Sequence, residues 1–254
     1  MGPADKKPIL PRYDIFENLK PGELVVADDS GLGTGGDGLG LVAPCNWLQH
    51  WENIMDPFHV AILHASFSGS QFVPEMAILP EGDWSYVPWG VRFTGLRTLE
   101  DGRVLKRITE VMAPAMRVVP SPLLRPGPID HLGWVLPVDD THYKVFNVVR
   151  TTSPGELPRS KYNGKRWSEL TEEEHQQFPG DYEAQVGQGP IAYHSEEHLT
   201  STDKGIGMVC RFLAAEIRKV QEGENPLGTI FDPQQALVTL EAGNFFPGDA
   251  EAAQ

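Results

Sequence analysis

The chain has 254 residues, 40% of them hydrophobic and 9% aromatic, so it can form a sizeable core and is neither a disordered protein nor a simple coiled coil. Its 35 acidic and 21 basic residues give a net charge of −14, which argues against nucleic acid or an anionic membrane surface as a partner. No apolar run is long enough to cross a bilayer and the first residues do not form a signal peptide, so we expect a cytoplasmic protein.

The first predicted segment, residues 1–44, is rich in proline and glycine and is expected to be an extended linker. Its glycine-rich part, residues 31–40, lacks both the leading strand and the Lys-Ser/Thr of a phosphate-binding loop, so a surface loop is expected there. The pattern then becomes helical over residues 46–65, and Pro57 should kink this helix.

A β-rich region follows, and a long helix comes after it. We expect hairpin turns at 100–102 and 139–141 and a short helix over 168–178. The clearest helix covers 202–222, where the apolar residues form one stripe. This order predicts an α+β fold, an antiparallel sheet curled around the long C-terminal helix, with a main domain over 45–230 and a tail over 231–254. The expected strands are 84–98, 103–112, 116–120, 131–138 and 143–149.

The helix predicted over 46–65 carries one polar stripe on an otherwise apolar surface. Asn46, Gln49, Asn53 and Asp56 recur at steps of three and four residues, and apolar side chains occupy the other faces. A helix that is apolar nearly all round is buried, and unpaired buried amides and carboxylates are costly. The stripe therefore faces a water chain, a sheet or a metal ion inside the protein.

Two histidines, His59 and His64, extend this stripe. A five-residue step separates two side chains around an ideal helix, so the rings converge only if the helix is bent or widened. Two imidazoles and a carboxylate bind ferrous iron or zinc, and such a set with open positions suits iron that binds oxygen. The alternative is a pair of helix histidines hydrogen-bonded to their neighbours. The His-Glu-x-x-His order of zinc peptidases is absent.

These residues carry a resemblance to a family. The run from Glu52 to His64, with Asp-x-x-His-x4-His at its end, resembles the iron-binding helix of Rieske non-haem iron aromatic ring-hydroxylating oxygenases. Residues 46–49, 188–211 and the Thr202-Asp203-Lys-Gly205 run are similar to the phthalate dioxygenase and dehydrodivanillate O-demethylase branch. The resemblance covers residues 40–225 and implies the helix-grip (START-like) fold.

The resemblance also implies roles for individual residues. His59, His64 and Asp203 would be the ligands of a mononuclear Fe(II), and residues 45–230 the catalytic domain. Asp56 would bridge toward the Rieske cluster of a neighbouring subunit, and Asn53 would hydrogen-bond near the metal. Residues alone leave the third ligand open, because an acidic residue in the first turn of a helix is commonly a cap. The competing carboxylates are Asp181, Glu183, Glu196 and Glu197.

The Cys-x-His and Cys-x-x-His pairs that hold a Rieske 2Fe-2S cluster are absent, because Cys45 and Cys210 are isolated. The cluster is therefore expected in trans or in a missing N-terminal domain. The leading hypothesis is an oxygenase that activates O2 at Fe(II) to hydroxylate or O-demethylate a carboxylated or methoxylated aromatic, with a Rieske or reductase partner and a homotrimeric assembly. The alternatives are a non-catalytic helix-grip module that binds a hydrophobic ligand, and a structural protein whose polar stripe orders its core.

Overall fold

The computed structural model describes residues 6–28, 32, 41–69, 71–154 and 161–247. Their helices are α1 Trp47–Met55, α2 His59–Ala61, a π-helix η2 Ile62–Phe67, α3 Glu172–Gln177, α4 Asp181–Gly187 and α5 Lys204–Gln221. Short 3-10 turns lie at Asp14–Phe16, Pro74–Ala77, Trp167–Glu169, His194–Glu196, Ser201–Asp203 and Pro233–Gln235. No helix in these ranges is both long and apolar enough to cross a membrane.

The strands form one large sheet and a small pair. Within the described ranges, nine strands join in the order β2-β9-β8-β6-β5-β11-β7, with β4 also paired to β5 and β3 to β4. The separate pair is β1-β10, which is parallel. The bounds are β1 Arg12–Tyr13, β2 Leu24–Asp28, β3 Glu81–Val87, β4 Gly90–Thr98, β5 Val104–Met112, β6 Met116–Val118, β7 Gly127–Pro128, β8 His131–Asp139, β9 His142–Thr151, β10 Leu237–Val238 and β11 Gly243–Phe245.

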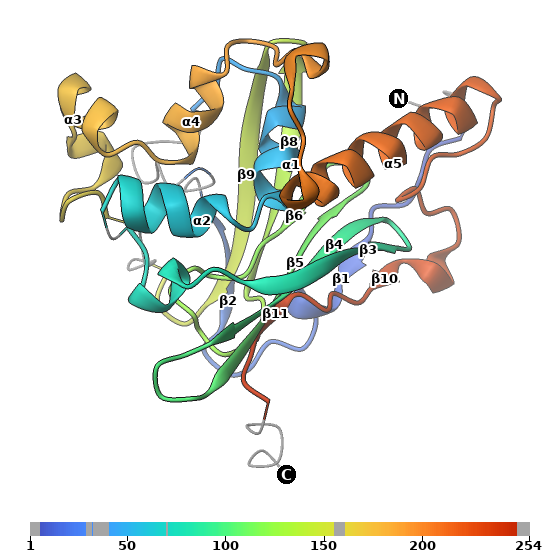
Figure 1. The fold of residues 1–254 in the computed structure, drawn as a ribbon. Coiled ribbons are helices and arrows are strands. Elements are labelled where there is room, and N and C mark those ends of the chain that lie inside the picture. The colour runs from blue at the N-terminus through green and yellow to red at the C-terminus, as the bar shows by residue number, and fades with distance from the viewer. Residues whose placement is uncertain (1–5, 29–31, 33–40, 70, 155–160, 248–254) are drawn as a thin grey trace.

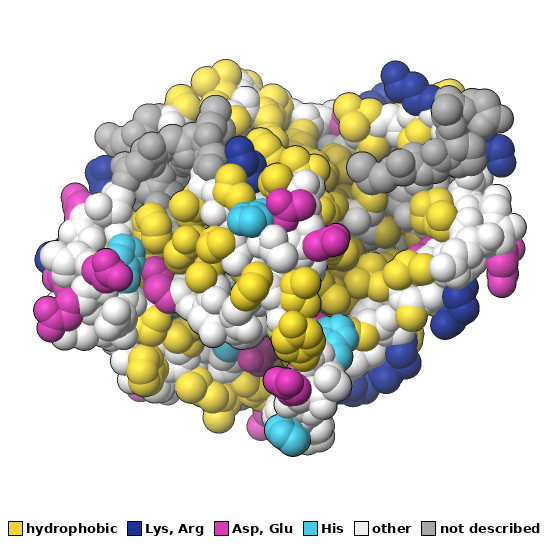
Figure 2. All heavy atoms as spheres, turned by 90° about the horizontal axis from the view of Figure 1, so that it is seen from above, with side chains coloured by type: hydrophobic (Ala, Val, Ile, Leu, Met, Phe, Trp, Pro, Cys, Tyr) yellow, Lys and Arg dark blue, Asp and Glu magenta, His cyan; other side chains and the backbone are white. Residues whose placement is uncertain are grey.

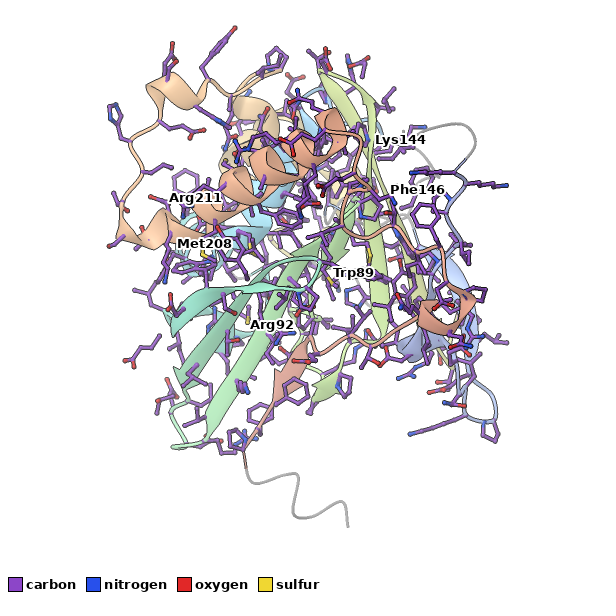
Figure 3. The ribbon with its side chains drawn as sticks, turned by 90° about the vertical axis from the view of Figure 1, so that its right-hand side faces the viewer. Trp89, Arg92, Lys144, Phe146, Met208 and Arg211 are labelled. Carbon is purple, nitrogen blue, oxygen red and sulfur yellow. The ribbon has the colours of Figure 1, made fainter. Side chains whose placement is uncertain are left out.

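Helices α1 and α5 cover one face of the antiparallel sheet, which confirms the expected α+β architecture (Figure 1). The core on this face joins Trp51 and Met55 of α1 and Phe212 of α5 to strand residues such as Val91 and Val111. Met208, which Figure 3 labels below α5, belongs to the same cluster. From above, over the helices, hydrophobic side chains occupy much of the surface and acidic side chains lie scattered among them (Figure 2).

A second core lies on the other face of the sheet and uses both ends of the chain. Ile108 and Met112 of β5 contact Tyr13 and Ile15 from the start of the chain and Val238 and Leu240 from its end. Because side chains alternate across a strand, Val111 points into the first core and its neighbour Met112 into the second.

Several elements differ from the sequence expectation. Residues expected to be linker and tail supply β1 and β2 and, at the other end, β10 and β11. Strand β2 forms one edge of the large sheet, β11 lies between β5 and β7, and the β1-β10 pair contributes Tyr13 and Val238 to the second core. The expected strand over 84–98 is a hairpin that turns at Pro88–Trp89. The 168–178 helix is α3, capped by Thr171 instead of Ser168. Helix α4 was not expected, and residues 33–40 of the glycine-rich stretch lie outside the described residues.

Candidate metal centre and its cavity

A break and a widened helix bring His59 and His64 together. Helix α1 ends at Met55, and the Asp56 carboxylate then accepts hydrogen bonds from the backbone N–H groups of Phe58, at 2.9 Å, and His59, at 3.2 Å, where α2 begins. The chain continues as the π-helix, in which residues five apart lie on one face. The two imidazole centroids are 5.3 Å apart. The helix is thus both bent and widened, as the five-residue spacing requires.

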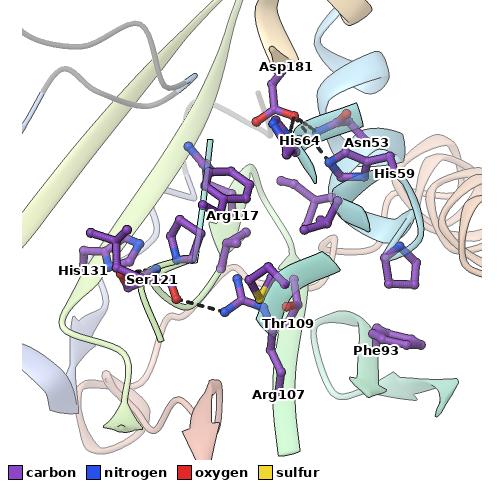
Figure 4. Close-up of a pocket in the computed structure, with 18 of the residues that line it drawn as sticks. Asn53, His59, His64, Phe93, Arg107, Thr109, Arg117, Ser121, His131 and Asp181 are labelled. Atoms are coloured by element: carbon purple, nitrogen blue, oxygen red, sulfur yellow. Dashed lines mark hydrogen bonds and ion pairs between the residues drawn. The ribbon is translucent and has the colours of Figure 1, made fainter. Parts of the chain in front are cut away.

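The third member of the cluster is Asp181, the first residue of α4 (Figure 4). Its Oδ1 lies 3.0 Å from Nε2 of His64 and 3.4 Å from Nε2 of His59. The amide of Asn53 donates a hydrogen bond of 3.1 Å to the same oxygen. One ligand atom from each of His59, His64 and Asp181 lies within 4.8 Å of the others, which is the donor set of a two-histidine, one-carboxylate metal site.

The outer nitrogens of both rings already have acceptors. Nδ1 of His64 donates to Oε1 of Gln71 at 2.6 Å, and Nδ1 of His59 donates to the backbone carbonyl of Asp56. The proton of each neutral ring is therefore on Nδ1, and the Nε2 lone pairs point at the carboxylate. The lone pairs of the two nitrogens and the negative carboxylate repel one another unless protons or a metal cation lie between them. The arrangement therefore fits a divalent metal ion.

Electrostatics link the three groups. Burial alone would raise the pKa of Asp181, but without a metal ion the imidazoles of His64 and His59, when they carry a proton on Nε2, outweigh it by charge and hydrogen bonding and hold that pKa well below its usual value. Burial alone would lower the pKa of His59, yet Asp181 and Asp56 raise it above its usual value. The carboxylate is therefore ionised at neutral pH, as a metal ligand must be.

The polar stripe of α1 faces helix α4 and positions Asp181. The side-chain amide of Gln49 donates to the carbonyls of Gln185, at 3.0 Å, and Gly189, at 3.1 Å. His50, which is buried, has its Nδ1 3.2 Å from Oε1 of Gln185, an oxygen that also accepts from the Tyr143 hydroxyl at 2.5 Å. Burial lowers the pKa of His50 to about 3, so this ring is neutral.

A cavity of about 200 Å³ opens from the cluster (Figure 4). Near the cluster, Phe72 lies with its ring centroid 4.4 Å from that of His64. Figure 4 shows Arg107 and Ser121 on the side of the cavity away from Asp181, and Arg117 lies between Asp181 and this pair. The cavity is thus apolar and aromatic in part and charged in part, with carboxylates (Asp28, Asp56, Asp130 and Asp181) as well as guanidinium groups (Arg97, Arg107, Arg117 and Arg125) in its lining. Its other lining residues include Ile54, Val60, Met76, Phe93, Thr109, Val119, Pro122, His131, Asn147 and Val149.

The structure does not bring Asp203 to the histidines, and this corrects the expected ligand set. The Asp203 carboxylate accepts hydrogen bonds from the backbone N–H of Thr200, at 2.7 Å, and from its hydroxyl, at 2.9 Å, so it orders the turn before α5. Gly205 of the same run packs so closely against Trp84 that an added Cβ atom would lie only 2.1 Å from Trp84 Nε1, so no larger residue fits there. The run therefore serves the start and packing of α5, and Asp181, one of the competing carboxylates, takes the place expected for Asp203.

The other competing carboxylates have different partners. Glu183 accepts from Trp167 Nε1 at 2.7 Å and lies 2.8 Å from His175 Nδ1. Glu197 lies 3.7 Å from His194, and Glu196 is exposed. Asn53 lies beside the cluster, with its amide 3.1 Å from Asp181 Oδ1, and Asp56 lies at the break with its carboxylate 3.9 Å from His59 Nδ1.

A second group of potential ligand atoms lies elsewhere on α1. Oε1 of Glu52 is 3.2 Å from His194 Nε2 and 3.9 Å from Cys210 Sγ. Burial and the charge of Glu197 raise the pKa of Glu52 to about 6.

The sequence analysis did not single out four residues that line or support the cavity, namely Gln71, Arg97, Arg107 and Arg117.

No protein-family model matches the chain. It is 46% identical over 248 residues to the alpha subunit of phenoxybenzoate dioxygenase from Ectopseudomonas oleovorans, covering 97% of this chain and 61% of that protein. It is 31% identical over 256 residues to the tert-butanol monooxygenase / tert-amyl alcohol desaturase oxygenase subunit of Aquincola tertiaricarbonis, covering 89% and 50%. Among solved structures, NdmB of Pseudomonas putida CBB5 matches with a TM-score of 0.50 and 18% identity over 85% of this chain and 56% of that one, a likeness of fold alone. The chain thus spans roughly half to three fifths of these relatives.

Proposed function

We propose, from the premise that this chain is a homologue of Rieske oxygenase subunits, that His59, His64 and Asp181 hold a mononuclear Fe(II) that oxygenates an aromatic substrate in the adjacent cavity. The observation that carries the proposal is the convergence of two Nε2 lone pairs and one carboxylate oxygen at the cavity wall. Among the described residues three ligands meet there, which leaves coordination positions for oxygen chemistry.

The ferrous ion, when bound, would supply the reduction of O2. The protein residues orient the ligands and shape the space beside them. Asn53 holds one oxygen of Asp181, and Gln71 fixes the tautomer of His64. The apolar lining, which includes Phe72 and Phe93, limits water at the reaction site and offers flat surfaces for an aromatic ring.

The electrons would come from a Rieske cluster outside this sequence. Cys45 is fully buried and Cys210 lies beside Glu52, so the two cysteines form no cluster site. Asp56 is the candidate bridge to that cluster, because its carboxylate is 30% exposed and also binds the backbone N–H of His59. A trimer, in which one subunit's cluster serves the next subunit's iron, would use this exposed position.

The substrate proposal follows from the lining and from the names of the relatives. Phenoxybenzoate is an aromatic acid, and tert-butanol is a small neutral alcohol. The more similar relative of the two acts on the acid, and the aromatic side chains and the arginines that line the cavity fit that class better. We therefore propose an aromatic carboxylate, with hydroxylation and O-demethylation both compatible with the site.

Anaerobic titration with Fe(II) tests the metal site. The unaltered chain should bind one iron per chain, and Asp181→Ala and His64→Ala should lose it. Asp203→Asn, which removes a carboxylate elsewhere in the same domain, should bind iron like the unaltered chain. Loss of iron in Asp203→Asn together with full binding in Asp181→Ala would overturn the assignment. Full iron binding with no turnover of any aromatic acid, given a Rieske donor and reductase, would favour a binding module instead.

A further inference from the structure

We propose that Arg97 and Arg107 form an anion subsite that binds the carboxylate of the substrate at the part of the cavity away from the metal cluster. The inference rests on the proposed function and deepens it, since it identifies the groups that select an acid. It is carried by the placement of the two arginines, by the partners that they have and by a comparison with Arg92, which lies on the same strand as Arg97.

The two arginines are neighbours on the face of the sheet that lines the cavity. Gly95 of β4 lies opposite Arg107 of β5, and Arg97 is two residues further along β4, so the two arginines are diagonal neighbours on one face. Arg97 is 2% exposed and Arg107 is 7% exposed. Leu96, between Gly95 and Arg97, is 43% exposed, so at this point the strand buries a cation and exposes a leucine. This inversion of the usual pattern needs a compensating interaction.

No carboxylate of the described residues supplies that compensation. Arg107 donates to the carbonyls of Ser121, at 3.1 Å, and Pro120, at 2.5 Å, and to the amide oxygen of Asn244, at 2.8 Å. These groups fix the guanidinium and leave its charge in place. Arg97 donates from Nε to the carbonyl of Ile78 at 2.8 Å, and the terminal nitrogens of its guanidinium have no partner among the described residues.

Arg92, on the opposite face of β4, shows how this protein treats a less buried arginine. Its side chain is 20% exposed, and it pairs with Glu110 at 2.5 Å and with Glu241 at 2.7 Å. Arg97 and Arg107 are more buried and lack such pairs among the described residues. Burial lowers the pKa of Arg97 to about 10, and burial together with the charge of Arg97 lowers that of Arg107 to about 9. Both side chains therefore stay charged at neutral pH, and no carboxylate in the described part of the chain pairs with either of them.

A planar carboxylate fits this subsite. The free N–H groups of Arg97 form a fork that can bind two carboxylate oxygens, and the anchored Arg107 beside it adds a second positive charge. The cavity that the arginines line also contains His59, His64 and Asp181. An acid held at the arginines would extend its ring toward the metal cluster, past Phe93. The net charge of −14 gives the protein surface no general attraction for anions, so binding an acid requires such a local site.

Binding of phenoxybenzoate and of the matching phenoxybenzamide to the metal-free chain tests the subsite, with calorimetry as the readout. The unaltered chain should bind the acid at least tenfold more tightly than the amide. Arg97→Met should weaken acid binding about 10- to 100-fold and leave amide binding unchanged, and Arg97→Lys should restore part of the preference. Arg103→Met, an exposed arginine between the same two strands, should change neither ligand.

The melting temperature of Arg97→Met controls for a structural role. Replacing an uncompensated buried cation by an apolar side chain should keep or raise stability in the absence of ligand. Equal binding of acid and amide by the unaltered chain, or unchanged acid binding in Arg97→Met, would overturn the subsite. Inorganic phosphate that competes with the acid at equal concentration would also overturn it, since the site would then be a general anion site. Because no metal is present, these outcomes are independent of the iron titration.

Discussion

Replacing Gln71 with methionine tests how the cluster selects a metal ion. Gln71 is 4% exposed, and its Oε1 is the acceptor for Nδ1 of His64. Its Nε2 donates to the carbonyl of Pro179 at 3.1 Å, but the Ser68 hydroxyl donates to that carbonyl at 2.6 Å and would keep it satisfied. The substitution therefore removes one essential contact, the one that keeps the His64 proton on Nδ1.

Without this acceptor, the proton of His64 should move to Nε2, where the Asp181 carboxylate lies at 3.0 Å. The ring would then have no lone pair toward the metal. Loss of a hydrogen bond that orients a metal ligand weakens metal affinity about 10- to 100-fold. This corresponds to about 1.4–2.8 kcal/mol, so at a fixed metal concentration the metal-induced rise in melting temperature should shrink by roughly 3–11 °C.

Chelator competition with Fe(II) or Co(II) measures the affinity, and thermal unfolding with and without metal measures the linked stability. Gln71→Glu, which keeps an acceptor at this position, should bind metal at least as well as the unaltered chain. Gln177→Met, on the exposed face of α3, is the matched control and should behave like the unaltered chain. Unaltered metal affinity in Gln71→Met would refute the tautomer argument, because the acceptor at Nδ1 of His64 would then not control whether Nε2 keeps the lone pair that binds the metal.

Two further predictions concern packing and pH. Gly205→Ala should destabilise the protein by about 1–3 kcal/mol, because the new Cβ would meet Trp84 and the Met55 carbonyl. Gly207→Ala should instead stabilise α5 by about 0.5–1 kcal/mol, because its Cβ would meet only the flexible end of Arg211, at 3.4 Å. Urea unfolding of both variants measures the two changes, and equal effects would contradict this reasoning. The pKa of Glu52 is raised from 4.5 to about 6, so its ionised form costs stability above pH 6 and costs none below 4.5. Glu52→Gln should therefore raise the free energy of unfolding by about 2 kcal/mol at pH 8 and by nearly nothing at pH 4.5, and a pH-independent difference would refute the cause.

The two histidine positions could be predicted because their evidence is local. A five-residue spacing and a proline before it require a bent or widened helix if the rings are to meet, and the break at Asp56 and the π-helix provide both. The α+β architecture also follows from local patterns, namely alternating apolar residues in the strands and one apolar stripe in α5. Likewise, the resemblance to Rieske oxygenases rested on that local run and is confirmed by the homologues.

The third carboxylate could not be chosen in this way, because its position depends on a long-range contact. Asp203 and Asp181 both lie at helix starts, and a helix start by itself favours an acidic residue. What distinguishes them is the neighbour of each helix: α4 lies against the polar stripe of α1, and α5 packs its glycine against Trp84. The stripe did contain the signal, since Gln49 and Asn53 need polar partners and α4 provides them.

The arginine subsite shows a limit of a different kind. Lys106 and Arg107 are adjacent on β5, so one of them must point toward the face that lines the cavity, but the sequence alone does not say which. The register settles it: Arg107 lies opposite Gly95, whose lack of a side chain leaves room for the Phe93 ring, and Arg97 follows on the same face. A one-residue shift in the pairing would instead turn these charges to the opposite face of the sheet and turn Leu96 toward the cavity. The observed register buries two positive charges and exposes Leu96, which costs free energy, and we infer that an anion bound in the cavity offsets this cost.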